Sequence, residues 1–400
     1  MNFHENTLMS SFRASPPSRR RVLIHSLFQF WILLFAGVVT TPPAAMADAD
    51  ASSDPIVFSF ATVGDSRYDS KAVDATPEEQ LWLQHVRPLA RILREIGAQH
   101  PKALFFNGDM IMGYSTNAHV LNRQYAYWRG MVVGLMETGT YVVPVPGNHE
   151  VQIKEIVGGV TNKVAHPAGE KAWRANMGDL ILATNRWHET SGESVTAWNL
   201  DHHPVVGGSD GIQTDQTQLS YSFDCRGIHF CILNTDAVGQ DSHAPVQWVS
   251  TDLQAAKARG NRHFFVFGHK MAFTYQFRDT DTEKAKGLDA FPENRDAFWN
   301  RVEEYGATYF CGHEHIYHSM VPRPNSPHPS WQIIAGSGGS PFEAKPGESS
   351  NPNDRTYAWA HVTVRASGRV TMDAFGFDDH FGPTRKIESI ELSPGSAPKP

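Results

Sequence analysis

The sequence predicts an α/β fold with a largely parallel, buried sheet. Three apolar runs, at 55–67, 103–109 and 141–150, are typical of strands, and helical patterns separate them. Strands that alternate with helices form βαβ units, in which parallel strands are covered by helices. Each run also contains a glycine followed by Asp or by Asn-His, side chains that can bind a metal ion. The pattern therefore predicts a sheet whose carboxyl edge carries polar groups.

The first helix is predicted to begin at Thr76–Glu79, where a capping box has proline at the first helical position. It should run towards Gly97 with a kink at Pro88, because proline removes an intrahelical hydrogen bond. A second helix is predicted at about 119–136, between the second and third strands.

Residues 151–217 interrupt the alternation of strands and helices and are rich in Gly, Thr, Asn and His. We expect a long insertion there, with one helix near 170–176, that covers one face of the sheet. Beyond it the sequence predicts a hairpin at 221–236, helices at 246–259 and from about 293 to 306, and strands at 263–270, 308–315 and 331–339. The hairpin turn would place Cys225 opposite Ile228, so no disulfide bond to Cys231 is expected.

The N-terminus has the features of an export signal. Arginines at 19–21 precede an apolar stretch at Leu27–Val39, and Ala45–Ala47 forms a small-x-small cleavage site. The stretch is short for a membrane span, which favours a cleaved signal peptide over an uncleaved anchor. Ser18–Leu23 resembles a twin-arginine signal, so that route and ordinary secretion both stay open. The sequence thus predicts a periplasmic or secreted protein with a signal peptide at 1–47, a linker at 48–54, a domain at 55–391 and a disordered tail at 392–400.

Charge and cysteine content exclude several classes of partner. The leader carries four arginines and one glutamate, so its removal changes the net charge from −7 to −10. Such an acidic protein is poorly suited to long nucleic acid, whose binding depends on Lys and Arg. The mature protein has no basic run typical of a membrane surface, and its three cysteines are too few for a disulfide framework.

Ligand-type residues recur after glycine along the chain. The series consists of Gly64-Asp65, Gly108-Asp109, Gly147-Asn148-His149, Gly268-His269 and Gly312-His313-Glu314-His315. Glycine lets the backbone turn sharply and approach an ion closely, and the carboxyl ends of parallel strands share one edge. Two Asp, one Asn and three His are enough for two divalent cations, and this mixture of nitrogen and oxygen ligands favours Mn, Fe or Zn.

These motifs, GDSR, NGDM, GNHE, GH and GHEH in that order, resemble those of the calcineurin-like metallophosphoesterase superfamily over about residues 55–380. The resemblance implies a four-layer αββα sandwich with two mixed sheets and a dinuclear metal site at the carboxyl ends of the strands. It implies a metal-dependent hydrolase of phosphate monoesters or diesters that uses a metal-activated hydroxide. The leader would make the chain an exported, bacterial-type member.

The resemblance also assigns roles to single residues. Asp65 and His315 would bind the first ion, Asp109 would bridge both ions, and Asn148, His269 and His313 would bind the second. His149 would protonate or stabilise the leaving group, with Glu150 as its orienting carboxylate. Within the last motif, Glu314 should face away from the ions and His318 should lie outside the site.

The first motif departs from the family pattern at Arg67, where Asp-x-His is usual. A guanidinium has no lone pair for a metal, so Arg67 either grips the phosphate or forms a salt bridge at the start of a loop. The first ion loses a ligand and is expected to bind weakly or to complete its shell with water. Purple acid phosphatases carry a tyrosine where this sequence has Met112, so that subtype is not expected.

A protease and a nuclease are disfavoured, and one alternative to the phosphoesterase stays open. A zincin protease would need His-Glu-x-x-His, and Tyr317 occupies the place of the second histidine. A nuclease is disfavoured by the net charge of −10. The alternative that stays open is a non-catalytic metal-binding or ligand-binding protein with a weakened first site. The expected partner is a small phosphorylated substrate, and the oligomeric state stays open.

Overall fold

The computed structural model of the chain describes residues 54–68, 77–181, 183–275 and 285–394. The predicted signal peptide, nearly all of the linker and the last six residues of the predicted tail lie outside the described residues. Within the described ranges, no helix is both long enough and apolar enough to cross a membrane.

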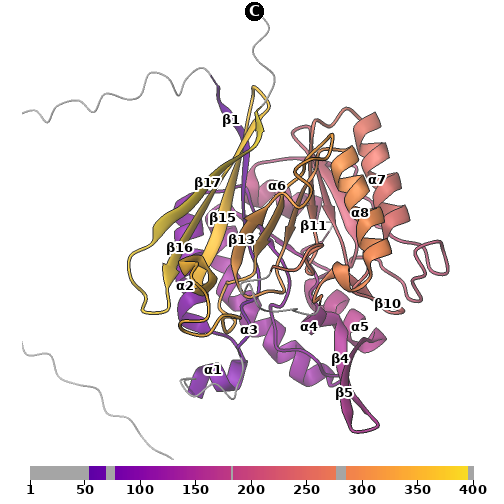
Figure 1. Cartoon of the computed structure of the whole chain (residues 1–400), viewed down its shortest axis with the longest axis vertical. Helices are drawn as coiled ribbons and strands as arrows, with labels where there is room; N and C mark the ends of the chain where they lie inside the picture. Colours follow the sequence, from indigo (N-terminus) through magenta and orange to yellow (C-terminus); the bar gives the residue numbers. More distant parts are fainter. Residues whose placement is uncertain (1–53, 69–76, 182, 276–284, 395–400) are drawn as a thin grey trace, which may run out of the picture. The chain divides into compact units, whose positions relative to one another are not determined.

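Two mixed sheets form the centre of the fold (Figure 1). The first has the order β17-β16-β15-β1-β2-β3, and the second has the order β13-β14-β12-β11-β8-β7-β6. The strands of the first are β1 (Ile56–Val63), β2 (Ala103–Phe106), β3 (Tyr141–Pro144), β15 (Thr356–Arg365), β16 (Arg369–Asp378) and β17 (Arg385–Pro394). Those of the second are β6 (Val195–Thr196), β7 (Tyr221–Cys225), β8 (Ile228–Ile232), β11 (His263–Phe267), β12 (Thr308–Cys311), β13 (Tyr317–Met320) and β14 (Gln332–Ala335).

The prediction of one largely parallel sheet is therefore wrong in part. Strands β1, β2 and β3 are parallel, as are β8, β11, β12 and β14, but antiparallel strands flank both groups. The long strands β15 to β17 were not identified from the sequence. Along β16 buried residues alternate with more exposed ones, which is the pattern of an antiparallel strand with one face in the core. The two mixed sheets implied by the family resemblance are confirmed.

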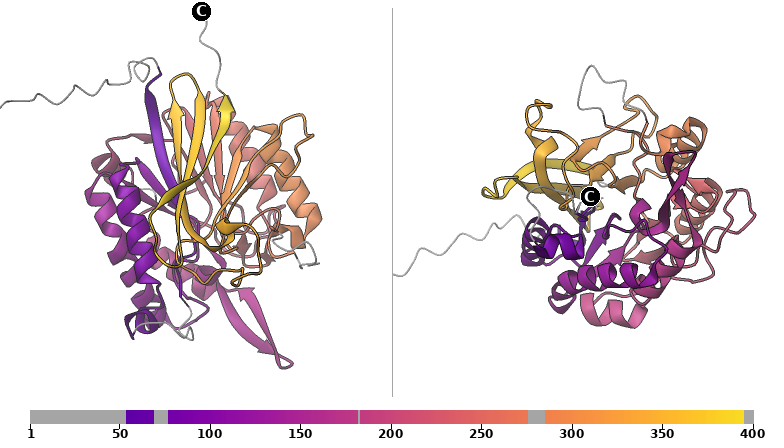
Figure 2. Two further views of the ribbon diagram at one scale, coloured as in Figure 1. Left: turned by 60° about the vertical axis from the view of Figure 1, so that its left-hand side comes forward. Right: turned by 90° about the horizontal axis from the view of Figure 1, so that it is seen from below.

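Helices cover the outer faces of the two sheets (Figure 2). Helices α2 (Val86–Ala98) and α3 (Ala118–Glu137) contact β15 and β3, and α7 (Val246–Ala258), which packs on α8 (Pro292–Glu304), contacts β8. Between the sheets, the Phe60 ring of β1 lies 5.0 to 5.8 Å from the rings of Phe230, Phe265 and Phe310 on the other sheet. Burying each such side chain contributes about 1.5–3 kcal/mol. The result is the four-layer sandwich that the resemblance implied.

The predicted first helix is divided into two. Helix α1 (Pro77–Trp82) ends before Leu83, whose φ of 57° leaves the helical region, and α2 begins three residues later at Val86. Pro88 lies in the first turn of α2, where a backbone N–H has no intrahelical acceptor, so the proline causes no kink. The predicted capping residue Thr76 lies outside the described residues.

The later predictions of local structure are confirmed. Helices α3, α7 and α8 and the β7–β8 hairpin lie where the patterns placed them, and Val249 and Phe298 are fully buried. Cys225 pairs with Ile228 across the hairpin, and its thiol is free. Strand β17 runs to Pro394, three residues beyond the predicted end of the domain.

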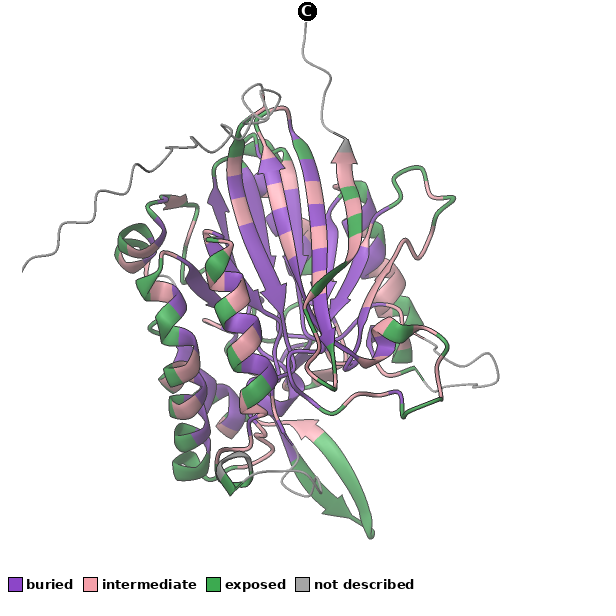
Figure 3. Ribbon diagram, turned by 90° about the vertical axis from the view of Figure 1, so that its left-hand side faces the viewer, coloured by how far each residue is buried: buried purple, intermediate pink, exposed green. Residues whose placement is uncertain are grey.

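The insertion 151–217 holds more regular structure than the one predicted helix. That helix is α5 (Pro167–Met177), and α6 (Thr184–Ser191) follows it and packs against β3. The insertion begins with a hairpin of β4 (Gln152–Val157) and β5 (Val160–Ala165), preceded by the short α4 (Asn148–Val151). The hairpin projects from the rest of the fold and most of its residues are exposed (Figure 3).

A buried charge network ties α7 to the second sheet. His229 is fully buried, with Nδ1 2.7 Å from Asp224 Oδ1 and Nε2 2.8 Å from Asp252 Oδ2. Burial opposes a charged imidazole, but the hydrogen bonds to the two carboxylates outweigh it and raise the pKa of His229. Asp224 is itself buried, yet hydrogen bonds from His229 and Arg259 lower the pKa of its carboxyl to about 2. His229 is therefore an imidazolium held between two carboxylates.

His229→Gln should lower the free energy of unfolding by about 3 kcal/mol near pH 5, because it removes the buried cation that lies between the two carboxylates. The raised pKa of His229 stabilises the fold below about pH 6.5, and this contribution is lost as pH rises through the folded-state pKa. The lowered pKa of Asp224 stabilises the fold above about pH 4, and that contribution is lost as pH falls towards 2.

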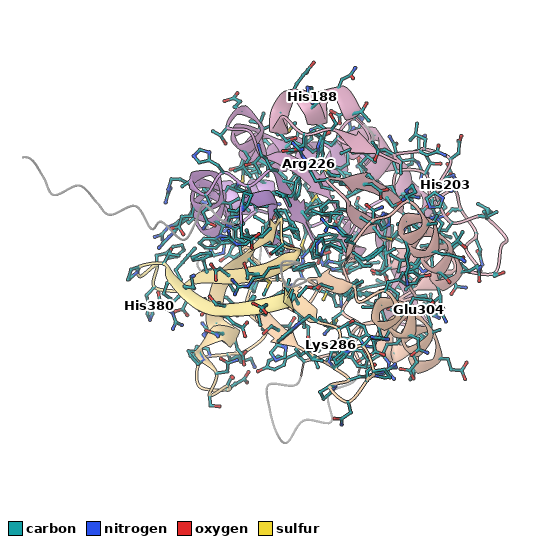
Figure 4. The ribbon with its side chains drawn as sticks, turned by 90° about the horizontal axis from the view of Figure 1, so that it is seen from above. His188, His203, Arg226, Lys286, Glu304 and His380 are labelled. Carbon is teal, nitrogen blue, oxygen red and sulfur yellow. The ribbon has the colours of Figure 1, made fainter. Side chains whose placement is uncertain are left out.

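Urea unfolding of wild type and variant across pH measures this difference, which should be largest between about pH 4.5 and 6 and shrink towards pH 9. The exposed His188, seen at the rim of the molecule in Figure 4, provides the control substitution His188→Gln. A difference between wild type and His229→Gln that does not vary with pH would contradict the imidazolium assignment.

Candidate metal centre

The predicted ligand residues meet at the carboxyl edges of the two sheets. Asp65, Asp109 and Asn148 follow the parallel strands β1, β2 and β3, while His269 and His313 follow β11 and β12. The sheets are packed face to face, so loops that are far apart in sequence converge at one point. All five of these side chains are buried or nearly so.

One group of ligand atoms is close enough to share a single ion. Asn148 Oδ1 lies 2.9 Å from both His269 Nε2 and His313 Nδ1, and the two ring nitrogens are 3.1 Å apart. Asp109 Oδ1 is 3.2 Å from His269 Nε2. Ligands about 2.1 Å from a common ion lie roughly 3.0–3.5 Å from one another, so these four residues fit a transition-metal ion. We call Asp109, Asn148, His269 and His313 the second metal group.

The other group consists of Asp65, Asp109 and His315, whose ligand atoms all lie within 4.8 Å of one another. His315 Nε2 is 3.8 Å from Asp65 Oδ1, a buried oxygen that has no hydrogen-bond partner. Burial and the charge of Asp109 raise the pKa of the Asp65 carboxyl well above its usual range. A cation beside both carboxylates would relieve this repulsion. These three residues, the first metal group, therefore also fit a divalent ion.

Arg67 reaches the first metal group directly. Its Nη2 lies 3.3 Å from His315 Nε2 and its Nε lies 3.5 Å from Asp109 Oδ2. The guanidinium thus donates towards the ring nitrogen that would bind the first ion. The contact with Asp109 is a salt bridge, as the second interpretation of Arg67 expected, whereas the contact with His315 was not anticipated from the sequence. Arg67 and a first ion would compete for the same two atoms.

The histidine tautomers suit metal binding. Nδ1 of His269 lies 2.7 Å from the Asn107 carbonyl, and Nδ1 of His315 lies 2.5 Å from the Pro341 carbonyl. A carbonyl oxygen only accepts, so each Nδ1 carries the proton and each Nε2 offers its lone pair to the centre. Burial, and then the charge of Arg67, lowers the pKa of His315 well below its usual range. Neutral imidazole is the form that a metal ion requires.

The backbone turns sharply at the candidate ligand residues themselves, and not only at the glycines that precede them. Asp65, Asp109 and His313 have φ values of 59°, 52° and 71°. This left-handed region costs about 1–3 kcal/mol for a residue with a side chain and is found mainly at functional sites. A Cβ on Gly312 would lie 2.2 Å from Asp65 Oδ2, so only glycine permits this approach of the two loops.

Glu150 does not orient His149, in contrast to the assigned role. Its carboxylate accepts hydrogen bonds from four backbone N–H groups, those of Gly147, Asp109, Met110 and Ile111, at 2.8 to 3.1 Å. These bonds join the loops after β2 and β3, so Glu150 is a positioning residue. Only the adjacent sequence number suggested a pairing with His149, and the turn of α4 directs the two side chains to different partners.

His149 faces the centre and is held by a partner other than Glu150. Its Nδ1 lies 2.6 Å from the Met112 carbonyl, which makes Nδ1 the donor, and its Nε2 lies 3.6 Å from Asp109 Oδ2. The Tyr114 ring lies tilted against this ring with centroids 4.0 Å apart, and its hydroxyl accepts a hydrogen bond from the Asn148 amide. Tyr114 therefore lies beside the second metal group and not beside the first, where purple acid phosphatases carry their tyrosine.

The remaining residues of the GHEH region lie as expected. Glu314 turns away from the centre and accepts a hydrogen bond of 2.9 Å from the Tyr275 backbone N–H. His318 stacks on the Tyr275 ring and not on any residue of the two metal groups. In the insertion, His202 binds Asp252 at 2.8 Å, in the charge network of His229.

Comparison with solved structures identifies the fold. No protein-family model matches the sequence, and no curated protein matches it either. The purple acid phosphatase PPD1 from yellow lupin (Lupinus luteus) seeds superposes with a TM-score of 0.50 at 12% identity, covering 86% of this chain and 56% of the lupin chain. The chain has the metallophosphoesterase fold. A dimetal phosphatase from Danio rerio matches with a TM-score of 0.42 at 12% identity, covering 85% of this chain and 99% of its own.

In this metallophosphoesterase fold the two metal groups occupy the sheet edge that the sequence predicted. The chain spans little more than half the length of the lupin protein, and the likeness concerns the fold alone. Function must therefore be argued from the side chains of this chain.

Proposed function

We propose that the protein is a metal-dependent hydrolase of phosphate esters with two divalent ions, Mn, Fe or Zn. The observation that carries the proposal is the second metal group, in which Asn148 Oδ1 and the facing nitrogens of His269 and His313 lie within 3.1 Å of one another beside Asp109. The two ring nitrogens face one oxygen atom and also face each other. A cation shared by all three atoms explains this arrangement better than any hydrogen-bonding pattern among neutral imidazoles.

The roles follow from these positions. Asp65 and His315 would hold the first ion, Asn148, His269 and His313 the second, and Asp109 both. Bound divalent ions would supply an activated water and neutralise the oxygens of the phosphate. Asn148 contributes an oxygen ligand without adding negative charge beside an anionic substrate.

His149 would handle the proton of the leaving group. Burial, and then Arg67, lowers the pKa of His149 well below its usual range, so the ring is neutral without substrate. A phosphate dianion beside the ring favours the imidazolium and brings its pKa back up. Protonated at Nε2, His149 can then donate to the leaving oxygen, while Nδ1 stays bound to the Met112 carbonyl.

Arg67 would change partners when substrate binds. Its contacts with Asp109 and His315 are 3.5 and 3.3 Å long, and its side chain is 16% exposed. A guanidinium binds phosphate oxygens through parallel hydrogen bonds, and turning towards them would free His315 Nε2 for the first ion. We further propose a small phosphorylated substrate and, on the strength of the leader at 1–47, action in the periplasm or outside the cell.

His149→Ala should lower kcat for phenyl phosphate by about 10²–10⁴ and leave metal content unchanged. The loss should be smaller for p-nitrophenyl phosphate, because p-nitrophenolate leaves without a proton. Steady-state kinetics with Mn²⁺, Fe²⁺ or Zn²⁺ measures both, and bis(p-nitrophenyl) phosphate tests diester hydrolysis in parallel. No metal-dependent turnover of any of the three esters by the wild type would favour the alternative of a non-catalytic binding protein.

Arg67→Ala should have two opposite effects. The KM for phosphate monoesters should rise about tenfold or more, since a charge-assisted contact to phosphate is lost. The first ion should bind more tightly, because its competitor for His315 Nε2 is gone. Arg67→Lys serves as the matched control that keeps the charge. Metal titration measures the ion affinity and steady-state kinetics measures KM. If neither changes in Arg67→Ala, Arg67 forms only a structural salt bridge.

A further inference from the structure

The β4–β5 hairpin is fixed against the metal centre. Strand β4 begins directly after α4, which carries Asn148 and His149 (Figure 1). At its base, Gln152 Nε2 donates to Asp236 and Asp241 at 3.1 and 2.6 Å, and the Ala165 backbone N–H donates to Asp241 at 2.9 Å. The base of the hairpin is therefore held in place, although its tip is exposed.

Two lysines of this hairpin lie side by side. Lys154 on β4 is directly opposite Lys163 on β5, and both ammonium groups lie over the ring of Tyr114, at 4.7 and 5.1 Å from its centroid. Like charges directly opposite each other destabilise a strand pair. Among the described residues, no carboxylate forms an ion pair with either lysine. The cation–π contacts with the Tyr114 ring offset only part of this repulsion. The two ammonium charges are therefore available to an anionic ligand.

Tyr114 connects the lysines to the reacting groups. The centroid of its ring lies 4.0 Å from that of His149, and its hydroxyl accepts a hydrogen bond from the Asn148 amide. The pKa of Lys163 is lowered by loss of solvent around it and by the charge of Arg67, and Lys163 in turn lowers the pKa of His149. The lysines therefore share one electrostatic field with the metal centre, on the side of His149 and hence of the leaving group.

We propose that Lys154 and Lys163 form an anion subsite that binds a second phosphate of the substrate, on its leaving-group side. Two ammonium groups match the charge of a phosphate dianion. The proposal rests on the proposed hydrolase function and names its substrate class: phosphate esters whose leaving alcohol carries another phosphate. Water adds to the scissile phosphorus, the alcohol oxygen leaves with a proton, and the products are phosphate and the remaining phosphorylated alcohol.

The kinetic test compares α,ω-alkanediol bisphosphates of three to six carbons with the corresponding monophosphates. For the chain length that spans the two sites, wild type should prefer the bisphosphate in kcat/KM by roughly 10- to 100-fold, since each charge-assisted contact contributes about one order of magnitude. Lys154→Gln combined with Lys163→Gln should abolish the preference, and the corresponding double substitution to Arg should retain most of it. Lys171→Gln, at an exposed position on α5, is the control that keeps the preference.

A binding experiment distinguishes a failure of the anion subsite from a failure of the hydrolase function. Calorimetry with alkane bisphosphonates and alkylphosphonates, which are not hydrolysed, should show tighter binding of the bisphosphonate to the metal-loaded wild type and equal binding to the Gln double variant. Equal binding of both ligands by the wild type, or the same loss for both in the double variant, would overturn the subsite. Absence of turnover with an intact bisphosphonate preference would overturn the hydrolase function instead.

Discussion

The structure depends on two carboxylates, Asp65 and Asp109, that are buried close together at the edge of the sheets. Without a cation this arrangement is costly, because burial and like charge both oppose ionisation. The surrounding features act to bring cations or donors to these oxygens. Glycine at 312 lets the GHEH loop approach Asp65, and histidines anchored through Nδ1 turn their lone pairs inward. The site is thus an electrostatic arrangement built for positive charge.

Arg67 makes the two metal groups unequal. The second group, around Asn148, is formed by close-set neutral and acidic ligands, and Arg67 contacts it through Asp109, which the two groups share. In the first group a permanent cation already lies beside Asp109 and His315. The first ion must therefore displace a guanidinium that could serve the substrate phosphate instead. Binding of metal and binding of substrate are expected to be linked through this one side chain.

The sequence was sufficient to find the residues that meet at the candidate metal centre and insufficient to find how their neighbours are placed. Asp65, Asn148 and His313 could be found because each follows a glycine at the end of an apolar strand, a local pattern. Glu150 was misassigned because three of its four backbone N–H partners belong to a loop about forty residues away in the sequence. The pairing of Lys154 with Lys163 depends on hairpin register inside an insertion whose strands have little apolar alternation. Strands β15 to β17 were not predicted because neither helical patterns nor ligand motifs accompany them in the sequence.

The most direct test of this account is the position of the ions in crystals grown with Mn²⁺, read from anomalous scattering. The account predicts two peaks, one on each side of the Asp109 carboxylate, with one of them about 2.1 Å from the facing nitrogens of His269 and His313. Asp109→Asn, which removes the shared charge, should lose both peaks or retain only a weak one. No peak at either group in the wild type, or two full peaks in the Asp109→Asn variant, would contradict the account.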